Sequence, residues 1–508
     1  MTRTDLNPTA TEGLSPMSRR VALGVGLGGA ALFATSSRAR GQSPTAPPPS
    51  TATTPAVATL RFLFDRITYG YNAAMWQRAQ ALGYTAFLEE QLHPEWIADP
   101  RVDAMLTQFP SLSMTSKQIY DQYYALGQGN TPPAELRAVA ILRASLSGRQ
   151  LHERMVEFWN DHFSIDQSDS QELVLKTAED RDVVRAHALG NFQDMLVASA
   201  RSAAMAFYLG NYRNTAASPN ENYGRELMEL HTLGVGNYTE HDVREVARCF
   251  TGWSFLQHAD PNYGDFVFNP VSHDSGAKVV LGQSIAAGGG VQDGERVLRI
   301  LAMHPATAQF IALKLCRWFI AYTPPQPLVD RVADAYLRTR GEIKAMIRAL
   351  FDPPSIALVT QDRLPKLKRP FHLVCSIFRA LDANLAQPAQ LTHELAKMGH
   401  QPFVWPTPKG YPDSTEAWGS GLLPRWTFAS ALFSDSISGV SIAVAPIFAN
   451  VPQSQLAAAV SQRLTGGALA RTDVAEIQTY VDAFPALTDT LEREVMALAV
   501  ASPSFQLY

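Results

Sequence analysis

The chain has 508 residues, of which 46% are hydrophobic and 18% charged, with a formal net charge of -4. These values lie in the ordinary globular range and exclude a disordered, collagen-like or membrane-spanning composition. The near-neutral charge balance gives no electrostatic reason to expect nucleic acid or an anionic membrane surface as a partner.

The N-terminus carries the strongest local signal. Arg19 and Arg20 precede an uncharged stretch, residues 21–34, that is rich in Gly, Ala and Leu. This stretch has about 14 residues, fewer than the ~20 that a membrane-spanning helix needs. Ser37-Arg38-Ala39 then offers a small-x-small cleavage site, so residues 1–39 are predicted to be a twin-arginine signal peptide for export to the periplasm or beyond. The alternative is an ordinary secretory signal or N-terminal anchor with two chance arginines.

Residues 40–57 are mostly Pro, Ser, Thr and Ala, which predicts an extended linker. From residue 58 to the C-terminus, at 508, apolar residues recur with helical periodicity, so we expect an all-α, mainly helical fold in a single large multi-helix domain. The clearest helical segments are 134–150, 151–163, 179–188, 191–200, 222–233, 242–250, 295–302, 305–319, 328–339, 342–350, 369–380 and 489–501.

Strand patterns are confined to residues 265–269 (DFVFN) and 278–281 (KVVL), separated by a loop that contains SHDSGA. They predict at most one small β-hairpin, near residues 265–281. The three cysteines, Cys249, Cys316 and Cys375, each lie in an apolar run without a CxxC spacing. Buried, unreactive thiols are therefore expected.

Several blocks in a fixed order carry a family resemblance. They are residues 155–163 (MVEFWNDHF), 220–234 (NENYGRELMELHTLG), 243–253 (VREVARCFTGW), 304–308 (HPATA) and 405–418 (WPTPKGYPDSTEAW). Together they resemble the bacterial family catalogued as domain of unknown function 1800, from about residue 61 to the C-terminus. The resemblance implies an exported, mainly helical protein, and a co-exported partner of the family catalogued as domain of unknown function 1501. It departs at Asn160, where relatives commonly have a second histidine.

Helical wheels at 100° per residue indicate which side chains of the two richest blocks face the core. In the first block, His162 falls on the apolar side, whereas the opposite side holds Glu153, Glu157, Asn160 and Asp161. In the second block, His231 falls on the apolar side. Glu229 and His231 diverge by about 200°, so a metal site on this helix alone is not expected.

One arrangement of these residues would bind a metal. His162 and His231 would meet from separate helices and be joined by His273 and Asp274 from the SHDSGA loop. Imidazoles with a carboxylate suit a transition metal. The alternative is a pair of core histidines, each bonded to a backbone carbonyl or a carboxylate.

A second arrangement would perform acid–base catalysis. Glu226 and Glu229, with Asp161 or Asp274, would form a carboxylate pair with one acid and one base, as in glycoside hydrolysis. The alternative is an ion pair between Arg225 and Glu229, which are four residues apart on one helix face.

Candidate substrate-binding residues are Asn222, Arg225, Trp253 and Lys278, and Lys314 with Arg317 could contact an anionic substrate. No GxSxG motif and no dinucleotide-binding fingerprint occurs. Three functions therefore stay open. They are a metal- or cofactor-dependent envelope enzyme, a metal-free hydrolase acting on a polysaccharide-like substrate, and a non-catalytic helical protein that works with a partner.

Overall fold

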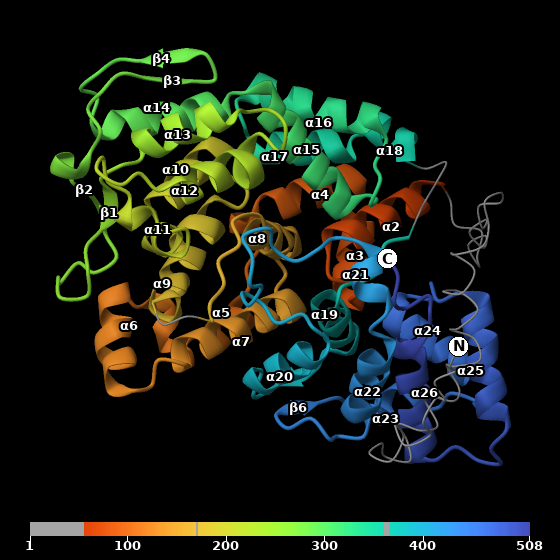
Figure 1. The fold of residues 1–508 in the computed structure, drawn as a ribbon. Helices are drawn as coiled ribbons and strands as arrows, with labels where there is room; N and C mark the ends of the chain where they lie inside the picture. Colours follow the sequence, from red (N-terminus) through yellow and green to blue (C-terminus); the bar gives the residue numbers. More distant parts are fainter. Residues whose placement is uncertain (1–54, 169–170, 360–364) are drawn as a thin grey trace, which may run out of the picture. The chain divides into compact units, whose positions relative to one another are not determined.

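The computed structural model describes residues 55–168, 171–359 and 365–508, and in these ranges the chain is mainly helical (Figure 1). The predicted helical class is confirmed. The predicted signal peptide, residues 1–39, and residues 40–54 of the predicted linker lie outside the described residues. Helix α2 begins at Pro55, within the last part of that linker. No helix in the described ranges has both the length and the apolar character that crossing a membrane requires.

Contacts divide the chain into two compact units, which are described separately. The first comprises residues 1–87, 365–400 and 414–508. Within it α22, α24, α25 and α26 pack on one another, in blue in Figure 1. Its elements are α2 (Pro55–Ile67), α3 (Ala73–Leu82), α19 (Pro370–Leu381), β5 (Asn384–Leu385), α20 (Ala389–Lys397), α21 (Thr415–Gly419), α22 (Leu422–Phe433), β6 (Val440–Ser441), α23 (Ala445–Phe448), η10 (Gln453–Gln455), α24 (Leu456–Thr465), α25 (Arg471–Asp482) and α26 (Asp489–Ala501).

The second unit comprises residues 88–364 and 401–413, and α4 (Tyr84–Leu92) runs across the sequence boundary between the units. Its first half contains η3 (Pro94–Trp96), α5 (Pro100–Leu106), η4 (Pro110–Ser113), α6 (Ser116–Gln122), η5 (Tyr124–Leu126), α7 (Thr131–Leu146), α8 (Gln150–His162), α9 (Glu172–Glu179), η6 (Asp180–Arg185), α10 (Phe192–Arg201), α11 (Ala203–Tyr208) and η7 (Asn211–Arg213). Its second half contains α12 (Glu221–Glu226), η8 (Leu227–Thr232), α13 (Glu240–Cys249), β1 (Trp253–Phe255), β2 (Phe266–Phe268), η9 (Pro270–Ser272), β3 (Lys278–Val280), β4 (Gln283–Ile285), α14 (Val291–Ala302), α15 (Pro305–Phe319), α16 (Gln326–Thr339), α17 (Ile343–Phe351) and α18 (Pro353–Val359).

Local sequence explains where the helices around the later site begin. Thr239 caps α13 through a capping box with Asp242, which satisfies the first free N–H groups of the helix. His304 caps α15, and Pro305 occupies its first turn, where a missing N–H costs nothing. Helix α15 has the predicted bounds. Helix α13 starts two residues earlier than predicted because its N-cap residue is Thr239, which places Asp242 inside the first turn.

The predicted hairpin is wrong in its pairing. Both predicted strands exist, but β2 pairs with β1, and β3 pairs with β4 across a tight turn, in antiparallel register. Strand β1 directly follows helix α13 and is only three residues long, so its pattern is hidden at the end of a helical run. With β5–β6 in the first unit, the described residues hold three two-stranded sheets rather than one.

Two segments of the second unit are π-helical, a rare conformation that is frequent at functional sites. One is η6, which continues α9, and the other is η8, which continues α12 through the second richest sequence block. The wheel analysis assumed a regular α-helix, yet His162 and His231 are both buried, at 1% exposure, as predicted. Glu153 departs from the wheel, because it is buried against Arg185. Cys249, Cys316 and Cys375 are free and buried, as predicted.

Candidate functional site

Two histidines from separate helices meet beside a lysine in the second unit. Nε2 of His162, the last residue of α8, lies 3.0 Å from the carbonyl oxygen of His231 in η8. Nδ1 of His162 lies 2.9 Å from Nζ of Lys314 in α15. Since an ammonium only donates, Lys314 donates to Nδ1 and the Nε2–H group donates to the carbonyl. His162 is thus a neutral imidazole with both nitrogens engaged.

The surroundings of these three groups are aromatic and largely dry. The rings of Phe163 and Phe192 lie against His162, with centroids 4.6 and 6.1 Å away. Burial, together with the charge of Lys314, holds the pKa of His162 well below its usual range and lowers the pKa of His231 to about 3. Burial also lowers the pKa of Lys314 to about 8, against the opposing charge of Asp161.

The predicted metal-binding arrangement is not assembled. His162 and His231 do come together, with ring centroids 6.0 Å apart. His273 and Asp274 belong to a different cluster, and among the described residues no three His, Cys, Asp or Glu side chains converge in a way that could hold a metal ion. His162 instead matches the alternative, a core histidine bonded to a backbone carbonyl.

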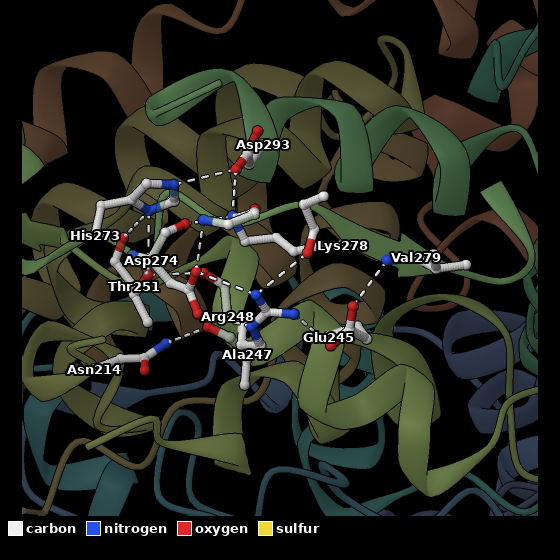
Figure 2. Close-up of polar contacts among 12 residues, drawn as sticks. Asn214, Glu245, Ala247, Arg248, Thr251, His273, Asp274, Lys278, Val279 and Asp293 are labelled. Atoms are coloured by element: carbon white, nitrogen blue, oxygen red, sulfur yellow. Dashed lines mark hydrogen bonds and ion pairs between the residues drawn. The ribbon is translucent and has the colours of Figure 1, made fainter. Parts of the chain in front are cut away.

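Figure 2 shows that second cluster, with His273 and Lys278 both facing Asp293. Nζ of Lys278 lies 2.7 Å from Oδ2 of Asp293, and Nε2 of His273 lies 3.1 Å from the same oxygen. Lys278 also donates to the carbonyl oxygens of Asp274 and Gly276. All three interacting side chains are at least nine-tenths buried. Lys278 is therefore an internal cation with three acceptors, and its predicted substrate-binding role stays a prediction.

Asp274 in the same cluster is held by an arginine. Nε of Arg248 lies 2.7 Å from Oδ2 of Asp274, and its NH1 group lies 2.7 Å from Glu245 (Figure 2). The hydrogen bond from Arg248 lowers the pKa of Asp274 to about 2. Glu245 in turn accepts a hydrogen bond from the backbone N–H of Val279. This network cross-links α13, the loop before β3 and the β3 strand, so its function is structural.

The predicted carboxylate pair lies at the junction of α12 and η8. Glu226 and Glu229 are both half-buried. Burial, and then the negative charge of Glu229, raises the pKa of Glu226. The hydroxyl of Tyr238 lies 2.7 Å from Oε2 of Glu229 and donates to it. The two carboxyls therefore differ in environment, one being desolvated beside a like charge and the other bonded to a phenol.

The expected ion pair between Arg225 and Glu229 does not form. Arg225 makes a bidentate pair with Glu240, with both N–O distances at 2.7 Å, and lies 3.5 Å from Glu221. The sequence spacing missed this partner because Glu240 is the first residue of the next helix, α13. As a result, Glu229 is not neutralised by the arginine four residues before it.

Other segments approach the carboxylate pair. Burial raises the pKa of Tyr208, in α11, to about 12. The charges of two other acidic residues and, as the smallest contribution, the charge of Glu226 act in the same direction. The positive charge of Lys409, in the 401–413 segment, lowers the pKa of Glu226. Next to Lys409, the backbone of Gly410 packs directly against the carbonyl of Asp161 at the end of α8. The negative charge of Asp161 raises the pKa of Lys314. The third predicted carboxylate therefore lies near the histidine–lysine cluster.

The remaining predicted substrate-binding residues do not converge. Asn222 is exposed and donates from its side chain to the carbonyl of Leu209. Trp253 is 1% exposed and packs against the rings of Phe250 and Phe266, so it lies in the core, and its predicted substrate-binding role stays a prediction. The side chain of Asn160, where the sequence departs from the family pattern, hydrogen-bonds to groups inside the protein.

Sequence reasoning missed several residues of this region. Lys176, which is completely buried, donates to the side chain of Asn160 at 2.8 Å and also to Glu179. Tyr238 and Lys409 lie in loops, where helical periodicity gives no signal. Lys314 was considered as a contact for an anionic substrate, and its pairing with His162 spans 152 positions.

No curated protein and no solved structure matches this chain. A family model matches residues 62–507, which is nearly the whole chain and includes every candidate residue above. The chain therefore belongs to the family described as protein of unknown function (DUF1800).

Proposed function

We propose that the protein is a hydrolase that cleaves a polysaccharide-like substrate by acid–base catalysis, with Glu226 as the acid and Glu229 as the base. The observation that carries this proposal is the different environment of the two carboxyls. Pairs of titratable groups whose surroundings push their pKa values apart are the usual acid and base of such sites. Burial and the neighbouring charge favour the protonated form of Glu226.

In the proposed reaction Glu226 acts as the acid and Glu229 as the base. Glu226 gives its proton to the oxygen of the leaving sugar as the glycosidic C–O bond breaks. Glu229 takes a proton from the attacking water as the new C–O bond forms, while the hydroxyl of Tyr238 holds its other oxygen. The half-buried indole of Trp405, in the same segment as Lys409, offers an apolar surface for a sugar ring.

The metal- and cofactor-dependent alternative has less support. Both nitrogens of His162 are engaged by protein groups, and the predicted ligands are divided between two clusters. The donor set at His162 and His231 therefore does not fit a transition-metal site.

The test is the release of reducing ends from a panel of soluble polysaccharides by the wild-type chain and three variants. We expect Glu226→Gln and Glu229→Gln to lower kcat by at least about 100-fold, the lower range for general acid–base groups. Glu221→Gln is the matched control, because it removes a carboxylate from the same helix, α12, away from the pair. Wild-type activity in Glu226→Gln would refute the assigned acid. No hydrolysis of any polysaccharide by the wild type would refute the substrate class.

We also propose export by the twin-arginine route, on the basis of Arg19 and Arg20, the uncharged stretch 21–34 and the small-x-small site at residues 37–39. Replacing both by lysine is expected to retain the chain in the cytoplasm, as measured by fractionation. Unchanged export would indicate an ordinary secretory signal.

A further inference from the structure

A polar cavity of about 330 Å³ lies at the N-terminal end of α8, in the second unit. Its volume is at the lower end of the range for small-molecule sites, about 300 to 1,000 Å³. The walls combine basic, acidic and hydroxyl groups from several elements. The residues that matter below are Arg143, Arg149, Arg185, Glu153, Asp99 and Ser147.

One arginine and one carboxylate of the cavity neutralise each other. The guanidinium of Arg185 makes a bidentate pair with Glu153, with N–O distances of 3.1 and 2.5 Å. Burial alone would raise the pKa of Glu153, but the charge of Arg185 outweighs it and brings the pKa to about 2. Arg185 also contacts Asp180 at 3.1 Å. Both oxygens of Glu153 are therefore bound by Arg185, while its charge also acts on nearby Arg143.

Arg143, near the end of α7, has no such partner. It is half-buried, and within the described part of the chain its guanidinium makes no hydrogen bond or ion pair. Burial, and then the positive charge of Arg185, lowers its pKa to about 10. A desolvated cation without a hydrogen-bonded partner is costly to the folded state. Arg143 lines the cavity, and none of its five N–H donors has a protein acceptor among the described residues.

Arg149 adds a second open donor group. Its Nε bonds to the carbonyl of Ile97 at 3.0 Å, and its two terminal nitrogens have no protein partner among the described residues. Arg149 is the N-cap residue of α8, a helix of 13 residues. The N-terminal end of such a helix carries a partial positive charge and free N–H groups, which favours an anion there.

The acidic residues of the walls do not cancel this charge. Asp99 accepts hydrogen bonds from the hydroxyl of Ser147 at 2.5 Å and from the N–H of Gly148, and burial raises its pKa. Asp103 is exposed and makes no ion pair among the described residues. Arg143 and the two terminal nitrogens of Arg149 thus keep hydrogen-bond donors that no described residue accepts, although the walls also hold the carboxylates of Glu95 and Glu153.

We propose that this cavity binds a small molecule through a carboxylate or phosphate group, which the guanidinium groups of Arg143 and Arg149 hold at the N-terminus of α8. Guanidinium groups recognise both oxyanions with paired N–H donors. The site is separate from Glu226 and Glu229, and it does not depend on the hydrolase proposal.

Calorimetric titration of the full chain with inorganic phosphate and with acetate, at constant ionic strength in chloride, tests this proposal. We expect saturable binding of at least one of the two anions, and the stronger one identifies the preferred oxyanion. Arg143→Gln and Arg149→Gln should each weaken that binding about tenfold or more, as expected for a lost hydrogen bond between charged groups. Arg338→Gln is the control, because it removes an exposed arginine of α16 that does not line the cavity.

A thermal melt gives an independent readout. Without oxyanion, Arg143→Gln should melt at a higher temperature than the wild type, because it removes an unpaired cation. Phosphate or acetate should raise the melting temperature of the wild type and of Arg338→Gln by mass action, but not that of Arg143→Gln. The proposal is overturned if neither anion binds or if Arg143→Gln keeps wild-type affinity. It is also overturned if Arg143→Gln melts below the wild type by the same amount with and without anion.

Discussion

Lys314 donates a hydrogen bond from its ammonium group to Nδ1 of His162, across 2.9 Å. The pair joins α15 to the end of α8, and its two members are buried together, with the charge of Lys314 lowering the pKa of His162. Burial therefore disfavours both charged forms. Two predictions on pH dependence follow from this cluster.

The first concerns Lys314, whose pKa in the folded chain is about 8, below the ordinary lysine value of 10.5. Below pH 8 the lysine is charged in both states, and the folded state bears the full cost of its burial. Between pH 8 and about 10.5 the folded chain has released the proton that the unfolded chain still holds, so stability rises with pH by up to about 1.4 kcal/mol per unit. Lys314→Met should therefore be more stable than the wild type at pH 7, with an advantage that shrinks as pH rises through this window. Denaturant unfolding at pH 7 and 10 measures the difference, with Lys117→Met, at a partly exposed lysine, as control. Equal pH slopes in wild type and Lys314→Met would contradict the prediction.

The second concerns His231, whose buried Nε2 has no hydrogen-bond partner among the residues that the structure describes. His231→Phe removes this atom and should stabilise the chain at pH 7 by about 1 kcal/mol. Because the folded pKa of His231 is about 3, the unfolded chain takes up protons first as pH falls below about 6.5, and stability is lost down to pH 3. The gain from His231→Phe should thus be larger at pH 5 than at pH 7. His241→Gln, at an exposed histidine, should show no such increase.

Periodicity was sufficient to predict the helices and the inward direction of His162 and His231, because both properties depend on residues within one or two turns. It could not predict the partners of those residues. Lys314 contacts His162 from another helix. Arg225 pairs with Glu240 because the turn between η8 and α13 brings the start of α13 next to α12. The π-helical segment η8 is equally invisible, because the pattern assumes a fixed 100° per residue.

The strand pairing and the buried partners of Lys278 could not be predicted for a related reason. A lysine in a short strand is expected at the surface, since its charge is costly to bury. Here the turn before β3 supplies two carbonyl acceptors and α14 supplies Asp293, so the charge is compensated inside the protein. Only the fold brings these acceptors together.

That compensation gives a third prediction, for the buried pair of Lys278 and Asp293. Lys278→Met leaves the carboxylate of Asp293 with His273 alone, and should destabilise the chain by about 3–5 kcal/mol. The double variant Lys278→Met with Asp293→Leu should cost less than the sum of the single variants, as measured by a double-mutant cycle in urea. Arg201→Gln breaks the partly exposed pair of Arg201 and Glu295 and should cost less than about 1 kcal/mol. Additive costs for Lys278 and Asp293 would show that the pair is not coupled.

The fourth prediction concerns Gly410, which fixes the 401–413 segment to the end of α8. Its φ is +71°, and an added Cβ would lie 2.1 Å from the carbonyl oxygen of Asp161, a backbone atom that cannot move aside. Gly410→Ala therefore adds a steric clash to the left-handed backbone cost of about 1–2 kcal/mol. Gly288→Ala is the matched control, because Gly288 has φ +83° and nothing within 4 Å of the added Cβ, so it carries the backbone cost alone.

Loosening this segment should also reach the carboxylate pair. The positive charge of Lys409 lowers the pKa of Glu226, against the effects of burial and of Glu229. If Gly410→Ala moves Lys409 away, the pKa of Glu226 rises further, and any activity that needs a protonated Glu226 extends to higher pH. Hydrogen exchange should at the same time become faster at the amide of Gln167, which donates to the carbonyl of Phe403 across 2.8 Å. Faster exchange with an unchanged pH profile would show that the packing of the segment does not affect catalysis. Equal losses of stability in Gly410→Ala and Gly288→Ala would show that the contact with Asp161 contributes nothing to stability.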